Sequence, residues 1–117
     1  MSVYETILKR RTIRKFKQEK ISREMFEKLI NAARLAPSAA NMQPLKYAII
    51  DDEVKVNQVF EHVKWAAYIA PEGTPSENER PTAFIAVLVD TEIKKNGYEL
   101  DIGAAVQNIL NRSTYIK

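Results

Sequence analysis

The chain has 117 residues, of which 45% are hydrophobic, 9% aromatic and 28% charged, so we expect a single domain over residues 1–117 with its own core. It has no cysteine and one histidine, which excludes a disulfide framework, a thiolate nucleophile and a metal site built from cysteines or several histidines. No apolar stretch approaches the roughly 20 residues that cross a bilayer, and charged residues interrupt the N-terminus too early for a secretory signal. We therefore expect a soluble, cytoplasmic protein without a membrane partner.

The formal net charge of +3 comes from one short part of the chain. Residues 1–20 hold seven basic and two acidic side chains, whereas the other 97 residues carry a net charge of −2. A surface that binds nucleic acid needs a wider basic patch, so we expect no nucleic-acid partner. A local cluster of this kind suits a small anion, or it is simply solvated.

Two helices are predicted in the first third of the chain. Ser2 followed by Glu5 forms a capping-box pattern, which predicts that the first helix begins there. The β-branched pair Thr12-Ile13 predicts that this helix gives way to an extended segment. A second helix is predicted from Ser22, and Pro37 ends it.

A strand, a helix and a loop are predicted next. Residues 46–50 form an apolar run closed by two aspartates, which is typical of a strand. Residues 51–53 are acidic and could bind a cation, but acids at this place more often cap the helix that follows. That helix is predicted over residues 56–63, where the apolar residues share one face, and the proline-rich residues 71–81 are predicted to form an exposed loop.

The last predicted elements are a strand, a turn and a helix. Residues 82–90 are apolar on both faces, which indicates a central strand covered by helices on both sides. Asn96-Gly97 marks a turn, and the final helix carries an apolar pattern from Leu100 to Leu110 that residues 111–117 break. A two-stranded sheet is marginal on its own, so the predicted central strand lacks partners.

The first candidate site is the basic segment Arg10-Arg11-Thr12-Ile13-Arg14. Alternate residues of an extended segment share a face, so Arg10, Thr12 and Arg14 can point the same way. Two guanidinium groups with a hydroxyl between them match the oxygens of a phosphate monoester. A solvated basic stretch is the alternative, which composition alone favours, whereas the stiff Thr12-Ile13 pair favours a fixed binding segment.

The second candidate site is the loop of residues 36–44. The small residues 38–40 would let a flat ligand approach the backbone closely. Asn41 and Gln43 offer amide donors and acceptors that suit the edge of a heterocycle. The alternative is an ordinary connection from helix to strand in which Asn41 caps its own turn, and the loop alone does not decide between the two.

A third segment, residues 101–108, opens the final helix. Gly103, Ala104 and Ala105 make one turn with almost no side-chain bulk, which permits close packing against another helix of the same subunit or of a second one. Packing explains this turn better than a catalytic role for Asp101.

Taken together, these segments resemble the nitroreductase family, the FMN-dependent NAD(P)H oxidoreductases. The matching stretches are Arg10-Arg11-Thr12-Ile13-Arg14, Ala36-Pro37-Ser38-Ala39-Ala40-Asn41-Met42-Gln43-Pro44, Glu79-Arg80-Pro81-Thr82-Ala83 and Asp101-Ile102-Gly103-Ala104-Ala105-Val106-Gln107-Asn108. They follow the order and spacing of the family over residues 1 to about 111. The resemblance implies an α+β fold with a central sheet flanked by helices, built as an intertwined homodimer with FMN at the subunit interface.

By matching position, the resemblance also implies two groups of cofactor-binding residues. The contacts to the phosphate and the flavin edge would be Arg10, Arg11, Thr12 and Arg14. The loop that reaches the flavin from the partner subunit would contribute Pro37, Ser38, Ala39, Asn41 and Gln43. No catalytic side chain and no metal ligand is implied, because the flavin does the chemistry.

The implied function is that of a flavoprotein oxidoreductase that passes hydride from NADH or NADPH through FMN to a small flat acceptor such as a nitroaromatic or a quinone. Family members continue beyond the final helix with further strands and helices, so we expect an incomplete fold, as in a truncated product or a short variant that completes its core by oligomerising. The alternatives are a catalytically impaired flavin-binding remnant and a structural domain whose basic N-terminus meets an acidic partner.

Overall fold

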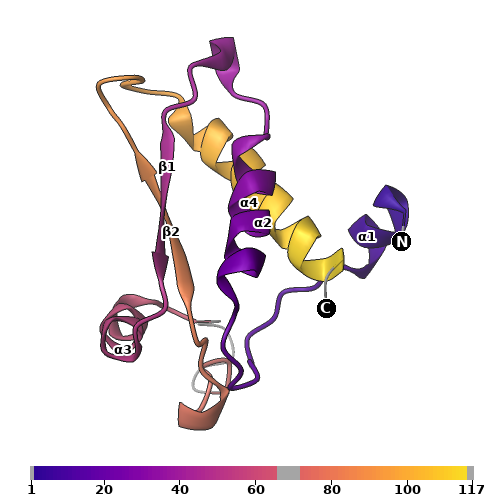
Figure 1. Ribbon diagram of the computed structural model, residues 1–117, viewed down its shortest axis with the longest axis vertical. Coiled ribbons are helices and arrows are strands. Elements are labelled where there is room, and N and C mark those ends of the chain that lie inside the picture. Colours follow the sequence, from indigo (N-terminus) through magenta and orange to yellow (C-terminus); the bar gives the residue numbers. More distant parts are fainter. Residues whose placement is uncertain (1, 66–71, 116–117) are drawn as a thin grey trace. The chain divides into compact units, whose positions relative to one another are not determined.

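The computed structural model describes residues 2–65 and 72–115 (Figure 1). In chain order the elements are α1 (Val3–Lys9), α2 (Arg23–Arg34), β1 (Leu45–Ile50), α3 (Glu53–His62), β2 (Phe84–Val89) and α4 (Tyr98–Tyr115), with short 3-10 turns at Ala39–Asn41 and Glu77–Glu79. The chain divides into two compact units: unit 1 combines Met1–Arg11, Ser22–Ala48 and Val87–Lys117, and unit 2 combines Thr12–Ile21 and Ile49–Ala86. None of the helices in the described ranges is long and apolar enough to span a membrane.

The predicted helix starts are confirmed by their capping contacts. At α1 the Ser2 hydroxyl accepts from the Glu5 amide at 3.1 Å, and the Glu5 carboxylate accepts from the Ser2 amide at 2.9 Å. At α2 the Ser22 hydroxyl accepts from the Met25 amide at 3.2 Å. The Asp52 carboxylate caps α3, so this acid has the helix-capping role that was expected of it.

The core of unit 1 forms where α2 lies against α4 (Figure 1). Phe26, Leu29 and Ala33 of α2 are buried, and Ala33 and Ala105 of α4 are each only 1% exposed. Small side chains at these two positions let the helices approach closely, which confirms packing as the role of Ala105. Gly103 differs, because it is exposed and a methyl group placed on it would meet open space.

Helix α4 continues to Tyr115, so the expectation that residues 111–117 break the helical pattern is wrong as far as residue 115. The polar side chains of this stretch are accommodated within the helix itself. Ser113 donates its hydroxyl hydrogen to the Ile109 carbonyl at 2.8 Å, and Thr114 donates to the Leu110 carbonyl at 2.9 Å. Hydroxyls that bond back to the preceding turn satisfy themselves without ending the helix, and Thr114 is only 8% exposed.

Strands β1 and β2 pair as a two-stranded sheet. They run antiparallel, since the Asp90 amide just after β2 donates to the Pro44 carbonyl just before β1 at 2.8 Å (Figure 1). No residue of β2 is fully buried and Leu88 is 51% exposed, so the expectation of a strand covered on both faces is wrong for this chain. The physical reason is that the described residues supply only one neighbour for the strand.

The core of unit 2 is an aromatic group under α3. The centroid of the Trp65 ring lies 5.7 Å from that of the Phe60 ring and 6.3 Å from that of the Phe16 ring. The Arg80 guanidinium carbon lies 4.2 Å from the centre of the Phe60 ring, a cation–π contact. Pro75 and Pro81 are buried, so the loop of residues 71–81, predicted to be exposed, is anchored at its described prolines.

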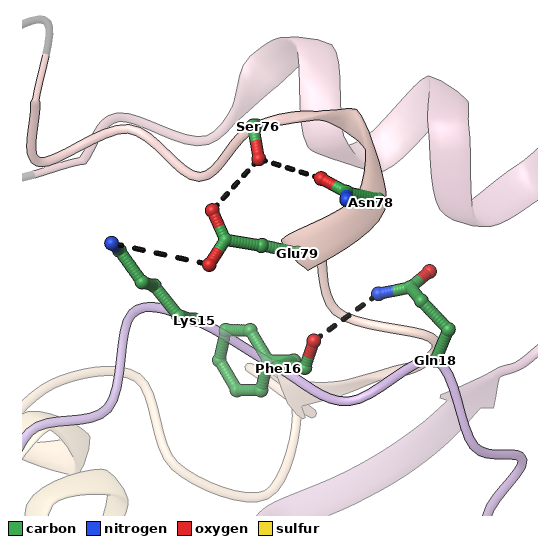
Figure 2. A network of polar contacts seen from close by, with 6 residues as sticks. All are labelled: Lys15, Phe16, Gln18, Ser76, Asn78 and Glu79. Atoms are coloured by element: carbon green, nitrogen blue, oxygen red, sulfur yellow. Dashed lines mark hydrogen bonds and ion pairs between the residues drawn. The ribbon is translucent and has the colours of Figure 1, made fainter.

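The segment Thr12–Ile21 has no helix or strand, yet contacts hold its middle part, from Lys15 to Glu19. The Phe16 amide donates to the Glu79 carbonyl at 2.9 Å. Lys15 also forms an ion pair with the Glu79 carboxylate at 3.9 Å (Figure 2). Further along, the Gln18 side chain donates to the Arg80 carbonyl and the Thr82 hydroxyl donates to the Glu19 carbonyl, both at 2.9 Å. These contacts keep the chain directly after the basic segment in one conformation.

Two matched leucine substitutions test the core of unit 1. Leu29→Ala should lower the free energy of unfolding by about 2–5 kcal/mol, because Leu29 is 7% exposed and its loss leaves a cavity. Leu35→Ala, at a leucine that is 63% exposed, should change it by no more than about 0.5 kcal/mol. Urea unfolding followed by far-ultraviolet circular dichroism measures both, and equal losses would contradict the assignment of the core.

Candidate functional site

The loop between α2 and β1 has a strained backbone. Three of its non-glycine residues are left-handed: Ala40 with φ 54°, Asn41 with φ 53° and Gln43 with φ 51°. This conformation costs a residue with a Cβ about 1–2 kcal/mol, and asparagine less because its side chain can bond to the nearby backbone. Such conformations cluster where function requires them, and they persist only where the surrounding structure holds them.

A chain of three polar contacts joins this loop to the start of α4. The Ser38 hydroxyl donates to Asp101 Oδ2 at 2.5 Å and accepts from the Gln43 amide at 3.1 Å. Lys94 Nζ donates to Asp101 Oδ1 at 3.2 Å. The Asp101 side chain is 4% exposed and that of Lys94 is 11% exposed, so the ion pair is shielded from water.

The surroundings of Asp101 keep its carboxyl group ionised. The hydrogen bond from Ser38 lowers the pKa of Asp101 most, and Lys94 and the Ala39 amide lower it further against the opposing effect of burial. An ionised carboxylate can only accept hydrogen bonds. The Ser38 hydroxyl hydrogen is therefore committed to Asp101, and the Ser38 oxygen is left to accept from Gln43.

Pro37, Ser38 and Gln43 line one pocket of unit 1, together with Tyr47 and Asp101. Its volume is about 120 Å³. Sites for cofactors and drug-sized ligands usually enclose about 300–1,000 Å³. The pocket by itself is therefore too small to enclose a flavin ring, and the loop can form only one wall of such a site.

The two amide side chains that were predicted as ligand contacts lie on the exposed side of the loop. Gln43 Nε2 donates to Asn41 Oδ1 at 2.8 Å, so Asn41 does not cap its own turn as the alternative interpretation supposed. Both residues are exposed, and Ala39 is exposed beside them. Within the described part of the chain the side-chain nitrogen of Asn41, Nδ2, has no hydrogen-bond partner and is available to a ligand.

The four residues of the basic segment differ in their availability. Arg11 donates to the carbonyls of Leu8 and Arg10, at 2.7 and 2.9 Å, and so helps to close the end of α1. The side chains of Arg10 and Arg14 form no hydrogen bond or ion pair with any described residue, and Arg14 and Thr12 are exposed. No hydrogen bond within the described residues of unit 1 joins Arg10 or Arg11 to the loop of residues 36–44.

The link between Asp101 and Ser38 was not predicted from the sequence. Asp101 was expected to be part of a packing turn, and the two residues are 63 positions apart. One signal was present: Asp101 stands in the first turn of α4, on the buried side that also carries Ala105. A carboxylate on a buried helix face requires a partner, although this requirement does not say which residue supplies it.

A second pocket, of about 370 Å³, lies within unit 2. Its lining carries charges of both signs: Lys20 and Arg80 are basic, whereas Asp51, Glu53 and Glu77 are acidic. Acidic groups outnumber basic ones, so this pocket does not favour a phosphate or another anion.

Comparison with known proteins identifies the family of this chain. The sequence model of the Nitroreductase family matches residues 7–115. The chain belongs to the nitroreductase family. Over 107 residues it is 34% identical to a protein of Archaeoglobus fulgidus assigned as an NADH dehydrogenase/NAD(P)H nitroreductase, covering 89% of this chain and 56% of that protein. A similarly assigned protein of Methanothermobacter thermautotrophicus is 28% identical, and the match covers 94% of this chain and 54% of that protein.

Solved structures place this nitroreductase-family chain in the same α+β fold. A protein of Parabacteroides distasonis, assigned as an NADH dehydrogenase/NAD(P)H nitroreductase, superposes with a TM-score of 0.81 at 29% identity, covering 97% of this chain and 62% of that one. A nitroreductase of Desulfovibrio desulfuricans, solved in complex with FMN, gives a TM-score of 0.78 at 28% identity, with 97% and 63% covered. The chain thus spans about half the length of its curated relatives.

Because the pKa of Asp101 is lowered in the folded protein, the stability of the fold should depend on pH. A carboxyl group whose pKa is lower in the folded protein stabilises the fold above its ordinary pKa near 3.8, and this contribution is lost as the pH falls through that value toward the folded pKa. The melting temperature of the parent protein should therefore exceed that of Asp101→Asn at pH 7, and the difference should shrink below about pH 4.

Differential scanning fluorimetry of both proteins between pH 7 and pH 3 measures this difference. Asp90, whose pKa is also lowered, is present in both proteins, so its contribution cancels. A difference that stays constant or grows toward pH 3 would contradict the assignment.

Proposed function

We propose that this chain binds FMN and belongs to an oxidoreductase that passes hydride from NADH or NADPH to a small flat acceptor, such as a nitroaromatic or a quinone. The observation that carries the proposal is the loop of residues 36–44. It combines small side chains, three left-handed residues and a buried polar anchor, in a chain that belongs to the nitroreductase family. An ordinary connection between a helix and a strand has no need of this strain.

The phosphate of FMN would be held by the basic segment. Arg10 and Arg14 suit this role, because their side chains have no partner among the described residues and guanidinium groups bind phosphate through paired hydrogen bonds. Thr12, which stands between them in the sequence, adds an exposed hydroxyl. Arg11 would contribute less to the phosphate, since it already donates to the end of α1.

The flavin ring would lie against the loop. Pro37, Ser38 and Ala39 leave the backbone accessible, and Asn41 and Gln43 present amide groups at the exposed side. Because the adjoining pocket holds only about 120 Å³, the ring needs a second wall. We propose that a second subunit supplies it, so that the working form is a homodimer, with residues 1–117 as one domain of each subunit.

When bound, FMN supplies the ability to take up hydride from one substrate and deliver it to another. The residues of this chain would hold the phosphate, orient the ring and leave one ring face open. No side-chain nucleophile, general base or metal ligand is needed, and we propose that none takes part. The proposed setting is the cytoplasm, where NADH and NADPH are available as reductants.

A double substitution in the basic segment tests the phosphate contacts. Arg10→Ala with Arg14→Ala should weaken FMN binding at least about 100-fold, since each removes a hydrogen bond between charged groups. Titration of the purified protein into FMN, followed by quenching of flavin fluorescence, measures the affinity. The control is Arg23→Ala with Lys28→Ala, which removes the same charge from exposed positions of α2.

The basic segment is not the phosphate site if both double variants bind FMN equally well. A loss of affinity in both to the same degree would point instead to a general effect of net charge.

Reduction by a nicotinamide separates the enzyme from a flavin-binding remnant. The FMN-loaded protein should lose the visible absorbance of oxidised flavin when NADH or NADPH is added without oxygen, and regain it when a quinone is supplied. A yellow protein whose spectrum stays oxidised under NADH and NADPH would be a flavin-binding remnant.

A further inference from the structure

The buried contact between Asp101 and Ser38 has a role besides stabilising the fold. A buried ion pair is not in itself a strong stabiliser, because removing both charges from water costs about as much as their attraction returns. The pair of Asp101 and Lys94 is nevertheless retained at 4% and 11% exposure, one contact away from the loop. If apolar side chains replaced Asp101 and Lys94, the hydrogen bond from Ser38 to Asp101 would be lost.

The hydrogen bonds around Asp101 and Ser38 run in directions that let Asp101 orient the loop. Lys94 donates to one carboxylate oxygen of Asp101, and Ser38 donates to the other. The Ser38 oxygen then accepts from the amide of Gln43, five residues further along the chain. Asp101 thereby fixes the rotation of the Ser38 hydroxyl, and the hydroxyl fixes the backbone of Gln43.

The residues enclosed by the hydrogen bond from Gln43 to Ser38 include the strained ones. Ala40 and Asn41 lie between its two ends, and Gln43 itself is left-handed. Without an anchor Ala40 and Gln43 would be more stable outside the left-handed region, because each has a Cβ. At the far end, Pro44 is buried and its carbonyl accepts from the amide of Asp90, so the loop is tethered on both sides.

We propose that Asp101 is a positioning residue, which acts through Ser38 to hold residues 39–43 in the conformation that presents the loop to FMN, left-handed at Ala40, Asn41 and Gln43. This inference deepens the proposed function and rests on it for the identity of the ligand. Asp101 itself touches no ligand in this proposal. Its role is to set the shape of the loop before the ligand arrives, so that binding does not have to order it.

Two variants interrupt the contact at different atoms. Asp101→Asn removes the charge that orients Ser38 and pairs with Lys94, and Ser38→Ala removes the hydroxyl. Ser38→Thr keeps a hydroxyl at the same place and serves as the conservative rescue. The control is Glu99→Gln, which removes an exposed carboxylate from the same first turn of α4.

The first readout needs no flavin. In the flavin-free protein, hydrogen–deuterium exchange of the Gln43 amide should be at least about tenfold faster in Asp101→Asn and Ser38→Ala than in the parent, while the core amides around Leu29 stay protected. Glu99→Gln and Ser38→Thr should exchange like the parent. If the Gln43 amide exchanges at the parent rate in Asp101→Asn, the positioning role is overturned. If Asp101→Asn is too unstable to protect the Leu29 region, the comparison of Ser38→Ala with Ser38→Thr decides, and equal exchange in those two overturns the role.

The second readout is the affinity for FMN, from quenching of flavin fluorescence. Asp101→Asn and Ser38→Ala should each weaken binding about tenfold, and the double variant should be no weaker than either single one, because both act on one contact. Additive losses, or unchanged affinity in Asp101→Asn, would overturn the proposal. A third outcome is that the parent fails to bind FMN while exchange of the Gln43 amide is still faster in Asp101→Asn and Ser38→Ala. In that case the proposed function fails, and the control of the loop by Asp101 stands.

Discussion

The candidate site depends on one hydrogen bond, from the Ser38 hydroxyl to the buried carboxylate of Asp101. It connects two segments that are far apart in the sequence, the loop after α2 and the first turn of α4. The packing of α2 against α4 through Ala33 and Ala105 brings these segments close enough for the bond to form. The two helices thus position the loop. Their small side chains set the spacing between α2 and α4, and the ion pair with Lys94 keeps the Asp101 carboxylate charged.

The same constraint explains why a loop of small residues can carry a costly backbone. Ala40, Asn41 and Gln43 are not glycines, so their left-handed conformations must be held from outside. Ser38 and the buried Pro44 hold the two ends, and the exposed amides between them remain available. A loop arranged in this way is rigid where it meets the protein core and open where a ligand would lie.

Local sequence patterns predicted the elements of this fold well. The caps at Ser2, Ser22 and Asp52 follow from short-range hydrogen bonding, and the structure has each of them. Sequence patterns failed where the outcome depends on tertiary context. The hydroxyls of Ser113 and Thr114 bond back within α4, so the helix runs further than its apolar pattern indicated. Strand β2 has the composition of a central strand but only one neighbour among the described residues. The Ser38–Asp101 contact was beyond any local pattern, because its partners are 63 positions apart in the sequence.

The central proposal is that the loop of residues 36–44, held by Asp101, is one wall of a flavin site. The most direct test is a crystal structure of the protein grown with FMN. We expect the phosphate within hydrogen-bond distance of Arg10 or Arg14, the ring against the loop, and the Ser38 hydroxyl between Asp101 and Gln43. FMN bound elsewhere, or a loop that leaves the left-handed conformation when FMN binds, would contradict this account.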